Sequence, residues 1–324
     1  MTTTKKSMIT NLKSLEPLEE EFVDAASSGY TAKVRELLSR GVPVDVLDNR
    51  DAPMGQTALM HAAHNGHLEV VGVLLDGGAN ISAKDKAVPT FPEVAHGHQP
   101  LHYGVRSKNV AVAEMLLDAG ANPNALNSQA KPPLNVAVQY GNLETVRLLL
   151  ARGAKLNLRV KNKGFFPPLC AAASANQREI FNELMKAGAD IHAVNPLNQT
   201  PLICAASAPE EIALPMIEAL LNAGAKVDHI DKFGNTALFA AVFQQSSNVV
   251  KALAQAGADI SRVFKEQGGT LLDAAEKRVQ ANQCNLDDPS STEWEKNAAR
   301  EGLEKWQSMF DLLRKLGAKR QSEL

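Results

Sequence analysis

The chain has few of the residues that mark secreted, disulfide-stapled or membrane proteins. Only three of its 324 residues are cysteines, Cys170, Cys204 and Cys284. A small and odd number of cysteines indicates reduced structural thiols, not a disulfide framework. No run of about 18 apolar residues is present, so we expect no membrane span. Residues 1–17 lack the apolar core of a secretory signal and are expected to form a flexible arm.

Neither sign of charge dominates, and aromatic residues are scarce. Lysine and arginine number 34 against 36 acidic residues, a net charge of -2. This balance provides no general attraction to nucleic acid or to an anionic membrane. The simplest location is the cytoplasm, with an exported effector that lacks a classical signal peptide as the alternative. The two tryptophans, Trp294 and Trp306, are expected to cover the end of the C-terminal core, and an interface role is the alternative.

One short pattern recurs along the whole chain: an apolar pair followed by Gly-Ala. Successive glycines of this pattern lie 33 to 42 residues apart as far as Gly257, and Gly317 follows after 60 residues. Such a fixed period is typical of repeat proteins, in which each unit packs on its neighbours. The glycines are Gly78, Gly120, Gly153, Gly188, Gly224, Gly257 and Gly317, with Gly41 as a weaker first copy.

The stretch from residue 55 to residue 83 predicts the structure of one unit. Thr57 is a good helix N-cap, and residues 58–65 follow as a short helix that Gly66 ends. Residues 68–75 place apolar side chains at helical spacing and predict a second helix with one buried face. One such pair cannot bury both of its faces, so the units must stack.

The openings of the units carry a specific resemblance. Prolines stand at the first helical position in four of them, Pro100, Pro133, Pro168 and Pro201, where a proline loses no hydrogen bond. With the motifs TALMHAA (57–63), QPLHYGV (99–105), PPLNVAV (132–138), PPLCAAA (167–173), TPLICAA (200–206) and TALFAAV (236–242), the chain resembles the ankyrin-repeat family over about residues 18–320.

The resemblance implies an all-α solenoid of about eight helix-turn-helix units with hairpin fingers. Residues 18–48 would form the N-terminal cap and residues 265–320 an irregular C-terminal cap. An insertion at about 279–296 is expected to separate the last two helices. Residues 84–98 and 159–166 are expected to form fingers, and Pro209 and Pro215 predict a different connection between the helices of their unit.

The sequence contains no pattern typical of catalysis or metal binding. His61 and His64 lie at helical spacing, but no carboxylate or cysteine near them in sequence completes a ligand set, so we expect no metal and no cofactor. The resemblance gives His67 and His102 hydrogen-bonding roles. No glycine-rich phosphate loop and no nucleophile motif is present, and the chain is therefore predicted not to be an enzyme.

The predicted function is binding of another protein through the concave groove and fingers, as an adaptor, an inhibitor or an immunity or effector protein. The chain is expected to act as a monomer. An enzyme that uses the C-terminal insertion, or a nucleic-acid binder that uses the basic finger at 159–166, is the alternative. The predicted partner-binding residues are His61, His64, Asn65, Tyr103, Arg106, Gln139, Tyr140, Lys161, Lys163, Phe165 and Phe166.

Overall fold

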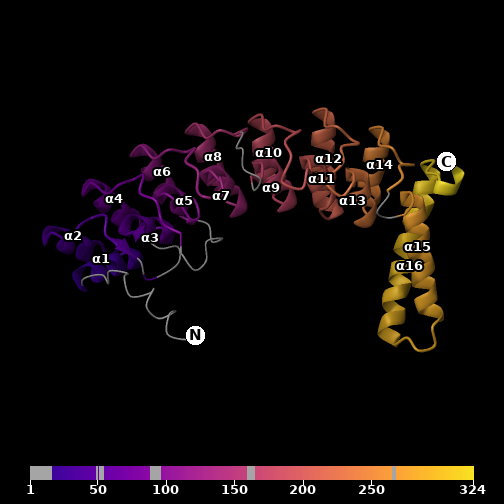
Figure 1. The fold of residues 1–324 in the computed structure, drawn as a ribbon, viewed down its shortest axis with the longest axis horizontal. Coiled ribbons are helices and arrows are strands. Elements are labelled where there is room, and N and C mark those ends of the chain that lie inside the picture. The colour runs from indigo at the N-terminus through magenta and orange to yellow at the C-terminus, as the bar shows by residue number, and fades with distance from the viewer. Residues whose placement is uncertain (1–16, 49, 51–54, 88–95, 159–164, 265–267) are drawn as a thin grey trace, which may run out of the picture. The chain divides into compact units, whose positions relative to one another are not determined.

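The regular secondary structure in the described residues is almost entirely α-helical, and the helices occur in pairs, as predicted. Its computed structural model describes residues 17–48, 50, 55–87, 96–158, 165–264 and 268–324 (Figure 1). The chain divides into two compact units, Met1–Phe165 and Phe166–Leu324, here called unit 1 and unit 2. Among the described residues, no helix has the length and apolar character needed to cross a bilayer.

Unit 1 contains four helix pairs that stack in sequence order (Figure 1). The first helices of the pairs pack on one another, α1 on α3, α3 on α5 and α5 on α7, and the second helices do the same. The elements are α1 (Pro17–Ser28), α2 (Thr31–Ser39), β1 (Leu47–Asp48), β2 (Gln56–Thr57), α3 (Ala58–Asn65), α4 (Leu68–Asp76), α5 (Pro100–Gly104), α6 (Val110–Asp118), α7 (Pro133–Gln139) and α8 (Leu143–Ala151). The short strands pair antiparallel, with Leu47 opposite Thr57.

The residues that were predicted to begin and end the helices stand at the ends of helices in the structure. The Thr57 hydroxyl accepts a hydrogen bond from the Met60 amide at 3.4 Å, and Gly66 ends α3 with a φ of 80°. This left-handed conformation is strained for residues with a Cβ, so glycine is the fitting stop. Pro100 and Pro133 begin α5 and α7 as expected. The local sequence therefore defines each helix pair before packing adds its contribution.

Three consecutive leucines at 148–150 predict two side chains buried between units, and the structure shows one. Only Leu149 is fully buried, whereas Leu148 and Leu150 are half-buried. Val146 and Leu149 lie one helical turn apart and form the buried stripe of this nine-residue helix.

Unit 2 continues with three further pairs and ends in a long helical hairpin. Its elements are α9 (Pro168–Ser174), α10 (Arg178–Lys186), α11 (Pro201–Ala206), α12 (Glu210–Asn222), α13 (Ala237–Phe243), α14 (Ser247–Gln255), α15 (Leu271–Asp287), α16 (Glu293–Lys315) and the 3-10 turn η2 (Gln321–Glu323). Pro209 lies in the connection between α11 and α12 and caps α12, as expected of a proline that changes this connection. The expectation is wrong for Pro215, because α12 continues through it. Buried Met216 and Ile217 hold the helix in place despite its missing amide donor.

The C-terminal insertion also differs from the prediction. Instead of separating two short helices, the extra residues lengthen α15 and α16, which pack along each other and extend past α14 (Figure 1). The two tryptophans have different surroundings. Trp306 is buried and meets Phe243 edge to face, with ring centroids 5.8 Å apart. Trp294 is 78% exposed, so only Trp306 covers the core.

Candidate functional site

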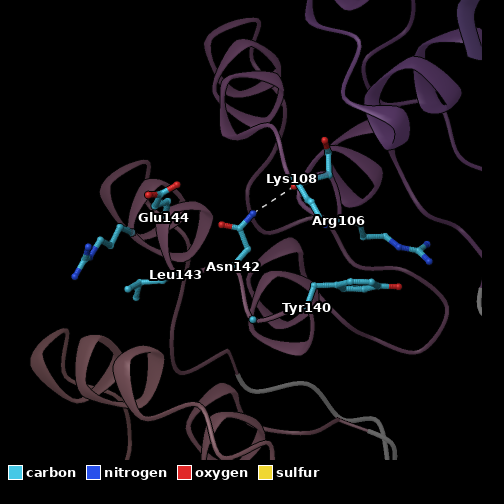
Figure 2. Close-up of a pocket in the computed structure, with 9 residues that line it drawn as sticks. Arg106, Lys108, Tyr140, Asn142, Leu143 and Glu144 are labelled. Carbon is cyan, nitrogen blue, oxygen red and sulfur yellow. Dashed lines mark hydrogen bonds between the residues drawn. The ribbon is translucent and has the colours of Figure 1, made fainter. Parts of the chain in front are cut away.

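The turn from Arg106 to Asn109, between α5 and α6, is the centre of the candidate site. It is tied to the repeats on both sides of it. Asn109 Nδ2 donates to the Gly66 carbonyl oxygen at 3.0 Å, and Asn142 Nδ2 donates to the Ser107 carbonyl oxygen at 3.3 Å (Figure 2). The turn is therefore a fixed platform for the side chains that it carries, not a free loop.

Arg106 is held against aromatic rings. Its guanidinium carbon lies 5.1 Å from the centroid of Tyr140 and 5.8 Å from the centroid of Tyr103, both within cation–π range. Figure 2 shows the side chains of Arg106 and Tyr140 extending in the same direction. The Arg106 Nε atom is enclosed and has no hydrogen-bond partner. Within the described residues Arg106 forms no ion pair, so no carboxylate of that part of the chain neutralises its charge.

Two open depressions flank the turn and share Arg106, Ser107 and Lys108 as a common wall. One has a volume of about 460 Å³ and continues along Tyr140, Asn142 and Leu143 (Figure 2). The other has a volume of about 610 Å³ and extends to His64 and Asn65. We call the exposed or half-buried residues His64, Asn65, Arg106, Lys108, Gln139 and Tyr140 the Arg106 surface.

Tyr103 was predicted to contact a partner, and this placement is wrong. Its side chain is only 3% exposed, and its hydroxyl donates to Asp85 Oδ2 at 2.5 Å. Burial and this hydrogen bond together raise the pKa of Tyr103 well above its usual value. Tyr103 therefore belongs to the interior, and its ring lies within cation–π range of Arg106.

The histidines of α3 also need correction. His61 was expected on the exposed face without a nearby carboxylate. Its side chain is 18% exposed, and its Nε2 lies 3.2 Å from Asp48 Oδ2. His64 is exposed as predicted and meets the Tyr103 ring edge to face at 6.0 Å. Partial burial, and then the charge of Arg106, lower the pKa of His64, so it is neutral at physiological pH. No cluster of metal-ligating side chains is found in the described part of the chain.

The remaining predicted residues have varied positions. Asn65 is exposed and donates to the Ser27 carbonyl oxygen at 2.8 Å, while Gln139 is exposed beside Tyr140. Lys161 and Lys163 lie outside the described residues. Phe165 ends unit 1 and Phe166 begins unit 2, and both are half-buried. The Arg106 surface therefore consists of residues of unit 1 alone.

Several residues that build the site were not predicted from the sequence. Ser107 is buried and its backbone and hydroxyl hold the turn, while Asn109 and Asn142 act as tethers. A sequence signal for the tethers was present, because the two asparagines lie 33 residues apart, each directly before a second helix. An amide at that position can reach back to the preceding turn.

The predicted hydrogen-bonding histidines are confirmed. His67 Nε2 lies 2.9 Å from the Ser27 carbonyl oxygen, and His102 Nε2 lies 3.2 Å from that of Lys131. The Gln99 amide donates to His102 Nδ1 at 3.1 Å, so Nε2 carries the proton and the ring is neutral. Burial, and then the neighbouring His98, lower the pKa of His102 to about 4.

The low pKa of His102 predicts a loss of stability in acid. The unfolded chain takes up the proton near about pH 6.5 and the folded chain only near pH 4, so protons favour unfolding in between. The contribution is complete above the unfolded value and falls as pH drops, by roughly 2 kcal/mol at about pH 5. Denaturant unfolding at about pH 5 and about pH 7.5 measures the loss. His102→Gln keeps a donor and an acceptor, and should flatten this dependence. Equal slopes in both proteins would contradict it.

Comparison with known proteins identifies the family. A family model described as "Ankyrin repeats (3 copies)" matches residues 22–127, 96–160 and 169–263. The chain therefore belongs to the ankyrin-repeat family. Ankyrin repeats indicate a protein-interaction module.

Three relatives show how much of the chain is shared. The chain is 29% identical over 221 residues to Ankyrin repeat protein nuc-2 of Neurospora crassa, covering 68% of this chain and 19% of that protein. It is 27% identical over 219 residues to the Putative palmitoyltransferase ZDHHC13 of Danio rerio, covering 67% and 32%. It is 29% identical over 183 residues to the B-cell lymphoma 3 protein homolog of Mus musculus, covering 56% and 40%. The matches span less than half the length of each relative.

Proposed function

We propose that this chain binds a partner protein through the Arg106 surface of unit 1, without catalysing a reaction. The observation that supports this most is Arg106 itself. Its guanidinium stacks on the half-exposed ring of Tyr140 and has no carboxylate partner among the described residues. Arginine and tyrosine are the residue types that dominate interface energetics when they pack into a partner. Stacking also fixes the arginine before binding, which reduces the entropy lost in the complex.

The consequence of binding depends on which surface of the partner is covered. An adaptor would leave the partner's active surface free, and an inhibitor or an immunity protein would cover it. The platform suits all three roles, because the turn is tethered on both sides and needs little rearrangement. We further propose that the chain acts as a monomer in the cytoplasm.

The test compares two charge reversals in unit 1. Arg106→Glu reverses the charge at the centre of the surface, whereas Arg35→Glu reverses an exposed charge on α2, away from it. Tagged wild type and both variants are used to capture proteins from extracts of the producing cells, with quantification by mass spectrometry. We expect specific partners to be recovered with wild type and with Arg35→Glu, and at least about tenfold less with Arg106→Glu.

Two outcomes have opposite meanings. If Tyr140→Ala lowers recovery of the same proteins as Arg106→Glu, the stacked pair is the binding centre. If all specific proteins are recovered equally with every variant, the partner binds elsewhere and the proposal is wrong. Circular dichroism and thermal melting of each variant serve as the folding control. We expect the fold to be kept, because the side chains of Arg35, Arg106 and Tyr140 are not part of the buried core.

A further inference from the structure

The charge of the Arg106 surface indicates the kind of partner that it accepts. Arg106 and Lys108 project from one turn, and neither has an ion-pair partner among the described residues. Arg147 also lines the depression beside Tyr140, and Glu144 is the acidic residue among its described lining residues. His64, which lines the other depression, is neutral and leaves this balance of charge unchanged. The surface therefore carries a net positive charge, although the whole chain is slightly acidic.

This unpaired charge differs from the arrangement of three other arginines of unit 1. Arg40 pairs with Glu36, Arg50 pairs with three carboxylates, and Arg152 pairs with Glu114 and Asp118. Carboxylates therefore hold each of these three arginines. Arg106 instead lies against aromatic rings and has no ion-pair partner among the described residues.

The position of Arg106 against the two rings determines which of its atoms a ligand can reach. A ring covers a face of the guanidinium and leaves its N–H groups, which lie in the plane, free to donate. Because Nε is enclosed, the two Nη groups are the donors that remain for a ligand. Two parallel N–H donors match the two oxygens of a carboxylate. Next to them lie the Tyr140 ring, 49% exposed, and the half-buried Leu143, which offer an apolar contact.

We propose that the Arg106 surface binds an acidic peptide segment of the partner. An aspartate or glutamate of that segment pairs with the Nη groups of Arg106, and Lys108 attracts a second carboxylate. A neighbouring apolar side chain of the segment packs on Tyr140 and Leu143. This inference rests on the proposed function, because it assigns a chemical class to the partner that the same surface binds.

The experiment selects ligands from a random peptide library displayed on phage, so the natural partner does not have to be identified first. Wild type, Arg106→Gln and Arg35→Gln serve as three parallel baits. Both substitutions remove one positive charge, and only the first removes it from the Arg106 surface. We expect wild type and Arg35→Gln to enrich peptides with acidic residues next to apolar ones, and Arg106→Gln to lose this enrichment.

A selected peptide then gives a quantitative test by fluorescence anisotropy. Replacing its acidic residues with glutamine or asparagine should weaken binding at least about tenfold, and Arg106→Gln should do the same. When the changed peptide is measured with Arg106→Gln, the fold-loss of affinity should be much smaller than the product of the two single fold-losses. Both changes remove the same ion pair. Affinity should also fall as salt increases.

The opposing outcomes separate this inference from the proposed function. Enrichment of neutral or basic peptides that still depends on Arg106 would overturn the acidic class and keep the binding surface. Enrichment that is equal for all three baits, or absent for all three, would overturn both. An oligonucleotide of single-stranded DNA, or a phosphorylated version of the peptide, that displaces the acidic peptide at lower concentration would show that the surface recognises phosphate instead.

Discussion

We expect Leu149→Ala to lower the free energy of unfolding of unit 1 by about 2–5 kcal/mol. Leu149 has no exposed surface and lies on the face of α8 that packs on α6 and α7. Truncation removes buried methyl and methylene groups and leaves a cavity that neighbouring helices fill only in part. Equilibrium denaturation in urea measures the loss as a lower transition midpoint with an unchanged slope.

Leu148 provides a matched control on the same helix. It is half-buried, so Leu148→Ala removes the same atoms from a site that water already reaches. Its cost should be less than half that of Leu149→Ala. Similar losses for the two variants would show that α8 presents a different face to the core. Circular dichroism should remain helical in both, because stability in a stacked repeat is a sum of local and neighbour terms.

The helix pairs could be predicted because their signals are local. Thr57, Gly66 and the prolines at the first helical position each act within a few residues of themselves. The same reasoning failed at Pro215, where long-range packing of Met216 and Ile217 outweighs one lost hydrogen bond. It also failed at the C-terminal insertion, because length alone does not distinguish a loop from two lengthened helices.

The candidate site was predicted in part. Of the predicted partner-binding residues, His64 is exposed and Arg106 is half-buried at the surface. His61 and Tyr103, each three residues earlier in the chain, are more enclosed than predicted. Both of these side chains contact an aspartate from the preceding finger, His61 with Asp48 and Tyr103 with Asp85. A contact between neighbouring repeats is not visible in the sequence of either repeat alone.

A periodic polar residue could have revealed these contacts. An aspartate or asparagine stands seven residues after the repeat glycine in five repeats, and every one of them is buried. Most of their Oδ1 atoms accept hydrogen bonds from backbone amides that follow in the chain. Asn127 Oδ1, for example, accepts from the amides of Gln129 and Lys131. The five residues are Asp48, Asp85, Asn127, Asn195 and Asp231.

Asp85 has the most demanding of these positions. Its side chain is fully buried, and its carboxylate accepts three hydrogen bonds. The donors are the His98 amide at 2.9 Å, His98 Nδ1 at 2.9 Å and the Tyr103 hydroxyl. The tautomer of His98 follows from its other neighbour. Asn127 uses Oδ1 to accept backbone amides, so its Nδ2 donates to His98 Nε2 at 3.1 Å. His98 therefore donates from Nδ1 to Asp85 and accepts at Nε2 from Asn127.

We expect Asp85→Ala to lower the free energy of unfolding by about 3–5 kcal/mol, because it leaves buried donors of His98 and Tyr103 without an acceptor. Tyr103→Phe removes one of these donors together with its bond and should cost about 1–2 kcal/mol. The double variant should lose clearly less than the sum of the two, since no hydroxyl is then left unpaired. Urea denaturation of the four proteins gives this coupling energy. Additive losses would mean that the Tyr103 hydroxyl and Asp85 contribute to stability independently of each other.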